Sequence, residues 1–416
     1  MVYPDVYDME NVCQFISSSG TTGKPKLITH SFSNKATSAH QQYLPLFRHY
    51  ESEDIWSPSE YPSGARILLT GSTFHVTTYN LISCSMAHGH CVVIPTPKEK
   101  SRVSELWRLM SVTKVNASCF LSSSIYALLQ HGQSIDGNHL KTAFVTGEII
   151  PSQLIRKFMR MMASGVGRDT ANPMRISNFY GTTECEVIGF SNPIAVTEWD
   201  APDLYDRVMT IRKCPGIELK VNNEADRELQ ISTPCLMTGY FNDVSKTDEV
   251  VTVDEQTQKR WYLVGEEVQF MEGDDASFRI MARNKDIFIT DGSTCYPQAV
   301  EDVLLKHERV NGAVVIGIGY SDIYIEEGLP GLDHPVAFVT ANLDRSELTE
   351  EGLVEELLVL CDAHLQRDLG EIPIKIFVMT DIPKTTNGKI LRNDLKSMAI
   401  EYFAEHKLQY SLRKSA

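Results

Sequence analysis

The chain has 416 residues, of which 42% are hydrophobic and 22% are charged, so we expect a soluble globular protein with two or three domains. A formal net charge of −15 argues against a general nucleic-acid binder and against binding to anionic membranes. Nine cysteines without a CxxC pair argue against a disulfide framework or a zinc site. We see no signal peptide and no apolar run long enough to span a bilayer, and therefore expect a cytoplasmic protein.

The first part of the chain alternates between strand-like and helical patterns. This spacing is typical of βαβ units and predicts a large α/β domain with parallel sheet. The strand-like runs are Arg66–Leu69, His90–Ile94 and Ala143–Val145, and the helical patterns are Ser104–Met110 and Ser152–Met162. Between residues 216 and 279, short apolar runs separated by turn residues predict a small antiparallel β region.

The last part of the chain predicts a small, mobile α+β domain. Strands are expected at 287–290, 313–318, 336–340 and 375–378, and helices at 297–307 and 353–368. We therefore expect a large domain over residues 1–283, a hinge at 284–285 and a C-terminal lid domain over 286–416.

A loop rich in glycine and hydroxyl groups follows the apolar run Val12–Ile16. Its sequence is Ser17-Ser18-Ser19-Gly20-Thr21-Thr22-Gly23-Lys24-Pro25-Lys26. Glycines let successive N–H groups face one anion, and hydroxyl and ammonium groups complete a cradle for a polyphosphate. It is not a Walker loop, which needs Gly at position 18 and Ser or Thr at position 25. A polar surface loop is the structural alternative.

A second stretch, Asn178-Phe179-Tyr180-Gly181-Thr182-Thr183-Glu184, lies between two apolar runs. Its aromatic ring can stack on a base, its hydroxyls can reach phosphate oxygens, and its carboxylate can hold Mg²⁺. A plain turn with a helix cap would also account for these residues.

Three further stretches complete the pattern. They are Trp261–Glu266, Arg283–Glu301 and Pro383–Arg392. The structural alternative is a charged linker between domains for the second stretch, and a tight Asn-Gly hairpin with an exposed lysine for the third. A further run, Glu228–Ile231 followed by Gly239-Tyr240-Phe241-Asn242, is typical of a strand and a turn, and no catalytic role rests on it.

In this order, the five stretches resemble the motifs of the adenylate-forming superfamily, which comprises acyl- and aryl-CoA synthetases, fatty acyl-AMP ligases, luciferases and peptide-synthetase adenylation domains. The resemblance covers nearly the whole chain. It implies ATP-dependent activation of a carboxylic acid to an acyl-adenylate with release of pyrophosphate. It also implies Mg²⁺ as cofactor and a thiol acceptor, either CoA or the phosphopantetheine of a carrier protein.

The resemblance also implies roles for individual residues. The expected contacts to ATP are Ser18, Ser19, Gly20, Thr21, Thr22, Gly23 and Lys24 in the phosphate loop, with Asn178, Tyr180, Gly181, Thr182, Glu266 and Arg283 elsewhere. The expected catalytic residues are Thr183 at the α-phosphate, Glu184 on Mg²⁺, Lys389 at the carboxylate and α-phosphate, and His75 in the acid pocket. Lys285 is the implied pivot of the small domain.

Three departures from the family pattern bear on substrate and activity. His75 stands where amino-acid-activating relatives carry an aspartate, so we expect an acyl or aryl acid, although a core histidine is the alternative. Glu266 replaces the aspartate that binds ribose and is one methylene longer. Relatives carry a longer segment before the phosphate loop, so we expect exposed apolar surface that a missing N-terminal subdomain or a partner chain would cover.

Two other functions remain open from the sequence. One is an acyl-AMP ligase that passes the acyl group to an amine or hydroxyl. The other is a nucleotide-binding protein without turnover, for which Glu266 and the short N-terminal part argue, whereas Lys389 and the phosphate loop argue against it.

Overall fold

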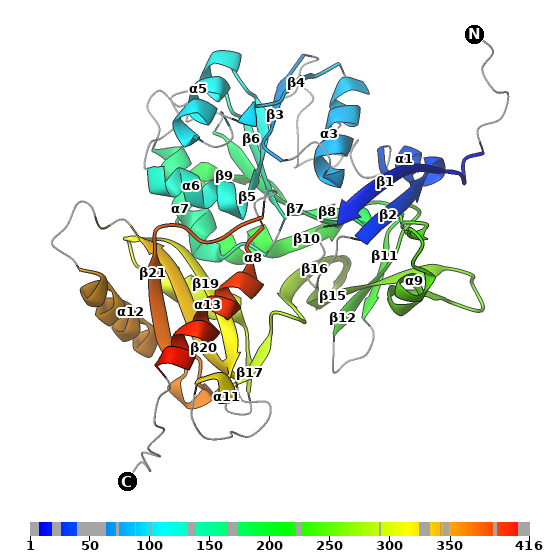
Figure 1. The fold of residues 1–416 in the computed structure, drawn as a ribbon. Coiled ribbons are helices and arrows are strands. Elements are labelled where there is room, and N and C mark those ends of the chain that lie inside the picture. Colours follow the sequence, from blue (N-terminus) through cyan, green and yellow to red (C-terminus); the bar gives the residue numbers. More distant parts are fainter. Residues whose placement is uncertain are drawn as a thin grey trace. The chain divides into compact units, whose positions relative to one another are not determined.

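The computed structural model describes residues 8–18, 26–39, 64–71, 75–87, 89–97, 99, 102–131, 139–147, 149–164, 173–221, 227–290, 293–323, 333–341, 343, 349–385 and 389–406. The chain divides into two compact units (Figure 1). Unit 1 contains residues 1–121, 134–147 and 159–281, and unit 2 contains 122–133, 148–158 and 282–416. Unit 2 thus includes two segments from the first half of the sequence, and the expected hinge at 284–285 stays a prediction.

The main sheet of unit 1 is mixed. Among the described residues its central path runs β11-β12-β15-β16-β10-β8-β7-β6-β5-β3-β4 (Figure 1). The strands from β4 to β7 are parallel, as predicted, and β6 is buried along its whole length, as strands covered on both faces are. These strands are β3 (Arg66–Leu69), β4 (Cys91–Val93), β5 (Ala117–Leu121), β6 (Thr142–Thr146) and β7 (Arg175–Thr182), with α3 (Val76–Ala87) and α5 (Val103–Thr113) between them.

The antiparallel half of this sheet begins where β8 turns back along β7. The sequence predicts a small antiparallel region between residues 216 and 279, and antiparallel strands are found there. Strand β10 pairs with both β8 and β16 and joins them to the parallel strands in one sheet. The antiparallel strands are β8 (Glu186–Phe190), β10 (Thr210–Lys213), β11 (Glu218–Val221), β12 (Glu228–Ser232), β14 (Val251–Val253), β15 (Arg260–Met271) and β16 (Asp274–Arg283), while β9 (Ile194–Ala195) pairs with β7 and α8 (Leu204–Met209) precedes β10.

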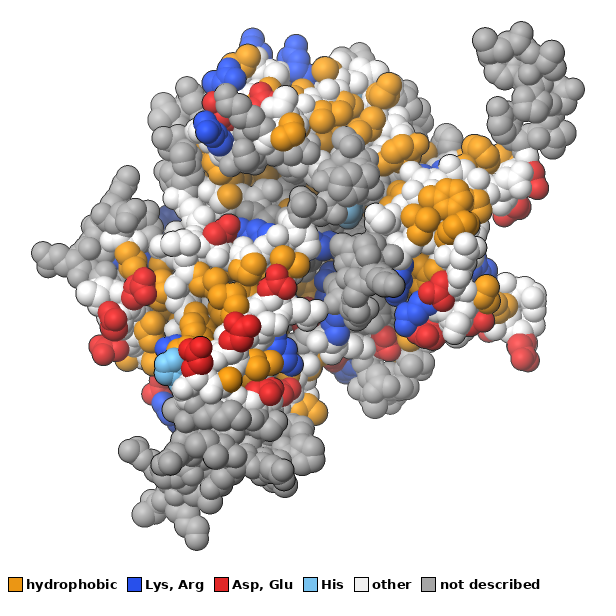
Figure 2. Space-filling model, in the orientation of Figure 1, with side chains coloured by type: hydrophobic (Ala, Val, Ile, Leu, Met, Phe, Trp, Pro, Cys, Tyr) orange, Lys and Arg blue, Asp and Glu red, His pale blue; other side chains and the backbone are white. Residues whose placement is uncertain are grey.

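A second, three-stranded sheet carries the two strands that flank the phosphate loop. Its order is β1 (Val12–Ser18), β2 (Lys26–Ser31) and β13 (Gly239–Tyr240), all antiparallel, and α1 (Phe32–Thr37) and α9 (Val244–Val250) follow β2 and β13. Hydrophobic side chains gather over β1 and β2 in Figure 2. Phe15 and Phe241 are 52% and 48% exposed, with ring centroids 5.1 Å apart, and with Leu27 they form what we call the hairpin patch.

Unit 2 is built on a sheet of order β19-β20-β21, of which β20 and β21 are parallel. Its core contains Val314, Phe338, Leu395 and Phe403. The elements are α6 (Ser122–His131), the first part of α7 (Ser152–Ala163), β17 (Phe288–Thr290), β18 (Ser293–Cys295), α10 (Pro297–Leu305), β19 (Val310–Gly319), α11 (Tyr320–Ile323), β20 (Asp333–Ala341), α12 (Glu350–His364), β21 (Lys375–Met379) and α13 (Arg392–Glu405). The helix predicted over 353–368 ends at His364, because Leu365 is extended.

Helices α7 and α10 of unit 2 cap each other. The Asp302 carboxylate accepts hydrogen bonds from the Ser152 hydroxyl at 2.9 Å and the Gln153 N–H at 3.1 Å, at the start of α7. The Lys157 ammonium donates to the carbonyls of His307, at 2.8 Å, and Val310, just after α10. Burial raises the pKa of Asp302 to about 6 and lowers that of Lys157 to about 8.

Within the described residues, no helix is long and apolar enough to cross a bilayer. A cytoplasmic location stays a prediction.

Candidate active site

The turn between β7 and β8 carries the second predicted motif. Its shape is fixed locally: the Thr182 hydroxyl accepts a hydrogen bond from the Cys185 N–H at 3.0 Å, and Glu186 adopts a left-handed backbone with φ of 62°. A Cβ on Gly181 would lie 2.2 Å from the Glu186 carbonyl oxygen, so only glycine fits there. The predicted residues Thr183 and Glu184 therefore lie on a tightly constrained turn at a strand end.

Glu184 is held by a segment far from it in sequence. The Tyr240 hydroxyl donates to Glu184 Oε1 at 3.0 Å, and the Glu184 carbonyl accepts from the Met237 N–H at 2.7 Å. The neighbouring Thr183 carbonyl accepts from His30 Nε2 at 2.9 Å. Burial lowers the pKa of His30, so the imidazole is neutral near pH 7 and carries its proton on Nε2.

Tyr180 and Glu266 meet across the sheet of unit 1. The Tyr180 hydroxyl donates to Glu266 Oε2 at 2.6 Å, and the two residues are only 8% and 7% exposed. The Tyr180 ring also lies edge-on to Phe278, with centroids 5.8 Å apart. The motif residue expected at adenine and the carboxylate expected at ribose are thus direct neighbours, while both nucleotide contacts stay predictions.

Asn178 and His75 lie elsewhere in unit 1. The Asn178 side chain is buried and donates to the Met209 sulfur at 3.8 Å, so its contact to adenine stays a prediction. His75 is partly buried just before α3, and its carbonyl accepts from the Tyr79 N–H at 2.9 Å. Its place in an acid pocket also stays a prediction.

The predicted phosphate-loop residues Ser19, Gly20, Thr21, Thr22, Gly23 and Lys24 lie outside the described residues. The register of the strands on either side is defined, with Ser17 opposite Leu27 and Ser18 opposite Lys26. The loop therefore connects two adjacent antiparallel strands.

Arg283 and Lys389 belong to unit 2. Arg283 ends β16, and its carbonyl accepts from the N–H groups of Asp286, at 2.9 Å, and Ile287, at 3.2 Å. Lys389 lies in a hairpin: its N–H donates to the Thr385 hydroxyl at 3.1 Å and its carbonyl accepts from the Thr385 N–H at 2.8 Å. The Asn-Gly pair predicted to form the turn lies outside the described residues. The roles of both side chains stay predictions.

Sequence reasoning missed a buried charge next to the turn. Glu186 is 2% exposed and accepts from the Lys35 ammonium at 2.5 Å, the Ser38 hydroxyl and the Asn80 amide. These donors come from α1, the residues just after it, and α3, and no sequence spacing links them to the motif. Tyr240 lies in the stretch Gly239-Tyr240-Phe241-Asn242, and nothing in that sequence marks it as a partner of Glu184.

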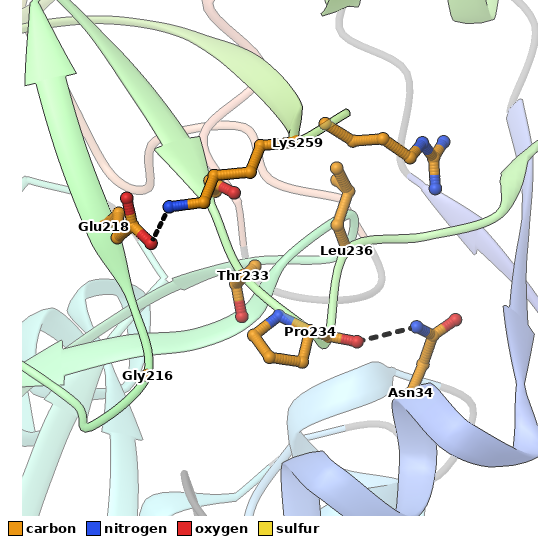
Figure 3. Close-up of a pocket in the computed structure, with 9 residues that line it drawn as sticks. Asn34, Gly216, Glu218, Thr233, Pro234, Leu236 and Lys259 are labelled. Carbon is orange, nitrogen blue, oxygen red and sulfur yellow. Dashed lines mark hydrogen bonds and ion pairs between the residues drawn. The ribbon is translucent and has the colours of Figure 1, made fainter. Parts of the chain in front are cut away.

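A pocket of about 360 Å³ opens on unit 1 (Figure 3). Asn34 donates to the Pro234 carbonyl at 2.8 Å on one side, and Lys259 pairs with Glu218 at 2.6 Å on the other. Its lining is Asn34, Gly216, Glu218, Ser232, Thr233, Pro234, Leu236, Lys259 and Arg260, which includes none of the predicted site residues.

The donor set suits a magnesium ion that arrives with a nucleotide. Mg²⁺ in phosphate-transfer sites takes one or two carboxylates plus substrate phosphates and waters. Glu184, whose Oε1 accepts a hydrogen bond from Tyr240, would supply one such carboxylate. In the described parts of the chain there is no cluster of three or more His, Cys, Asp or Glu side chains that could form an all-protein cage.

Comparison with known proteins agrees with the superfamily that the motifs indicate. A family model described as AMP-binding enzyme matches residues 3–241. The mitochondrial medium-chain acyl-CoA ligase ACSF2 of Bos taurus is 25% identical over 395 residues, covering 91% of this chain and 56% of the relative. The 2-succinylbenzoate–CoA ligase of Bacillus cereus is 23% identical over 400 residues, covering 95% of this chain and 72% of the relative. The chain thus spans little more than half of the first relative.

Solved structures confirm the predicted fold class. The anthranilate CoA ligase AuaEII in complex with anthranoyl-AMP has a TM-score of 0.73 at 19% identity, covering 95% of this chain and 69% of that chain. The O-succinylbenzoate coenzyme A synthetase MenE from Bacillus subtilis, in complex with ATP and magnesium ion, has a TM-score of 0.65 at 21% identity, covering 94% and 70%.

Proposed function

Because the chain belongs to the AMP-binding enzyme family, we propose that it uses ATP to convert a carboxylic acid to an acyl-adenylate, releases pyrophosphate, and transfers the acyl group to a thiol. The observation that carries this proposal is the constrained turn after β7, which holds Thr183 and Glu184 through His30, Tyr240 and Met237. A rigid turn with an oriented carboxylate supports positioning of a nucleotide phosphate.

In the proposed reaction, a carboxylate oxygen of the acid attacks the α-phosphorus of ATP in line with the leaving pyrophosphate. Thr183 contacts the α-phosphate, and Lys389 offsets the negative charge that develops as one anion attacks another. A magnesium ion bound by Glu184 would neutralise phosphate charge. The thiol then attacks the acyl carbonyl and AMP leaves.

The nucleoside part of ATP is proposed to bind at Tyr180 and Glu266. These two side chains already share a hydrogen bond of 2.6 Å. A ribose hydroxyl can replace that hydroxyl as donor to Glu266, so nucleotide binding exchanges one hydrogen bond for another. The phosphate loop and Arg283 complete the proposed ATP contacts.

The proposed acid is an acyl or aryl acid. His75 cannot supply the anion that would pair with an α-ammonium group. Relatives named as medium-chain acyl-CoA and 2-succinylbenzoate–CoA ligases support this choice and support CoA as the thiol. A carrier protein, or an amine or hydroxyl acceptor, is the alternative for the second step.

The test is acid-dependent ATP–pyrophosphate exchange with fatty, aryl, hydroxy and amino acids. We expect exchange with one class of acyl or aryl acid, and a loss of about 10²- to 10³-fold in Lys389→Ala, the range seen when one charge-stabilising group is removed. Lys384→Ala is the matched control, because Lys384 lies in the same hairpin but pairs with Asp381 at 2.8 Å.

The outcomes separate the alternatives. Exchange with α-amino acids alone would contradict the argument from His75. Folded protein that binds ATP but exchanges with no acid would contradict the proposed activity and favour nucleotide binding without turnover. Where exchange occurs, offering CoA, a carrier protein or amines identifies the acceptor.

A further inference from the structure

We propose that Tyr240 is a positioning residue for the metal-binding carboxylate of Glu184 and couples it to the strand that leaves the phosphate loop. The proposal rests on the proposed function. It concerns the Gly239–Asn242 stretch, to which sequence reasoning assigned no chemical role.

The contact itself selects one oxygen of the carboxylate. The Tyr240 hydroxyl lies 3.0 Å from Glu184 Oε1, and Tyr240 is 6% exposed. A carboxylate only accepts hydrogen bonds, so Tyr240 donates, and its oxygen is left to accept from Tyr262, whose hydroxyl bonds to it. With Oε1 engaged and the rotation of the carboxylate restricted, Oε2 is the oxygen oriented for a metal ion.

The backbone around Tyr240 connects the Glu184 turn to β2. The Met237 N–H donates to the backbone carbonyl of Glu184 at 2.7 Å, the Thr238 N–H donates to the Thr29 carbonyl at 2.8 Å, and the Phe241 N–H donates to the Leu27 carbonyl at 2.7 Å. The Arg260 guanidinium donates to the carbonyls of Met237, at 2.9 Å, and Thr238, at 3.1 Å. Residues 237–241 are therefore hydrogen-bonded both to the Glu184 turn and to β2, the strand after the phosphate loop.

The face of the Tyr240 ring makes a second, separate contact, with the side chain of Lys26. The Lys26 ammonium lies 4.6 Å from the ring centroid, within cation–π distance. Lys26 is the first residue of β2 and the last lysine of the loop stretch. One side chain thus contacts a carboxylate through its hydroxyl and a cation through its ring.

The consequence is a metal affinity that depends on a single hydroxyl. Groups that orient a metal ligand change metal affinity or activity by about 10- to 100-fold when removed. Tyr240→Phe keeps the ring and its contact to Lys26 but removes the donor to Glu184. We therefore expect Tyr240→Phe to weaken metal binding in the presence of ATP by about 10-fold or more.

The experiment measures Mn²⁺ binding to the protein with ATP by electron paramagnetic resonance, since Mn²⁺ substitutes for Mg²⁺ at oxygen ligands. ATP affinity without metal and the Mg²⁺ concentration that half-saturates exchange are measured beside it. Tyr402→Phe is the control, because it also removes one hydroxyl from a ring but lies on α13 of unit 2. Glu184→Gln and the double variant complete a cycle.

The proposal is supported if Tyr240→Phe lowers Mn²⁺ affinity at least 10-fold, leaves metal-free ATP affinity within about 3-fold, and regains exchange at high Mg²⁺. It also requires that adding Tyr240→Phe to Glu184→Gln lower the Mn²⁺ affinity little further. Unchanged Mn²⁺ affinity, additive effects, or a wild type that binds no Mn²⁺ with ATP would overturn it. A wild type that binds Mn²⁺ and ATP but exchanges with no acid contradicts the proposed function instead, and the Mn²⁺ affinities still decide the role of Tyr240.

Discussion

Two carboxylates, the buried Glu186 of unit 1 and the partly buried Asp302 of unit 2, are held by different kinds of hydrogen-bond donor. Glu186 accepts from the ammonium of Lys35, a hydroxyl and a side-chain amide. Asp302 accepts from the hydroxyl of Ser152 and a backbone N–H at the start of α7. The first set of donors includes a full positive charge, whereas the donors to Asp302 carry partial charges.

This difference determines which change, a mutation or a shift in pH, destabilises each region. A buried ion pair leaves an uncompensated charge when either partner is removed. Asp302 has no such cation among these donors, so burial disfavours its ionised form and raises its pKa to about 6, although the hydrogen bonds from Ser152 and Gln153 favour the ionised form. We therefore expect the Glu184 turn to be sensitive to mutation and the α7–α10 contact to be sensitive to pH.

The largest effect is expected from Glu186→Gln. Removing the carboxylate leaves the Lys35 ammonium without its anion, and the free energy of unfolding should fall by about 3 kcal/mol. Urea unfolding followed by circular dichroism measures this. Adding Lys35→Met to the variant should restore part of the stability, and a double variant no more stable than Glu186→Gln would contradict the ion-pair account.

The next effect is a pH dependence that Asp302 confers. Its folded pKa is raised above its unfolded value, so its contribution is fully present below about pH 4 and is lost as pH rises through about 6. The shift of about 2 units corresponds to a loss of about 2.5 kcal/mol. The measurement is urea unfolding from pH 4.5 to 7.5 for wild type and Asp302→Asn. The free energy of unfolding of wild type should fall with pH relative to that of Asp302→Asn. If the two free energies change in parallel with pH, Asp302 is not the source of the pH dependence.

A smaller effect is expected from Ser152→Ala. The variant removes one of the donors to Asp302, and loss of one hydrogen bond in a capping position costs about 1 kcal/mol. Since that donor favours the ionised carboxylate, its removal should also raise the pKa of Asp302 further. Thermal unfolding at pH 7 and titration of the Asp302 carboxyl by NMR measure the two effects, and an unshifted titration would contradict the assigned hydrogen bond.

The smallest effect is expected at an exposed pair. Lys259 and Glu218 lie 2.6 Å apart, but their side chains are 43% and 52% exposed. Such pairs contribute less than about 1 kcal/mol and are screened by salt. In 0.5 M NaCl, the free energy of unfolding of Lys259→Ala should therefore equal that of wild type within experimental error. A loss as large as that of Ser152→Ala would show that the wall of the pocket in Figure 3 is more important for stability than its exposure indicates.

Local patterns predicted the elements because burial and periodicity are encoded in neighbouring residues. The apolar run that became β6 is an example, as is the placement of Glu184 just after a strand. The partners of these residues are not local: Tyr240 is 56 residues from Glu184, and Lys35 is 151 from Glu186. The joining of the two sheet halves through β10 was missed for the same reason, since strand pairing depends on tertiary packing. At Glu266 the sequence showed the extra methylene, but only the fold identified Tyr180 as its partner.

The hairpin patch has a consequence for handling the protein. Phe15 and Phe241 are each about half exposed to solvent, with their rings packed edge to face. Kosmotropic salts such as ammonium sulfate are excluded from protein surfaces and strengthen the association of apolar groups. The hairpin patch should therefore contribute to retention in hydrophobic-interaction chromatography, and Phe15→Ser should elute earlier than wild type, at a higher salt concentration.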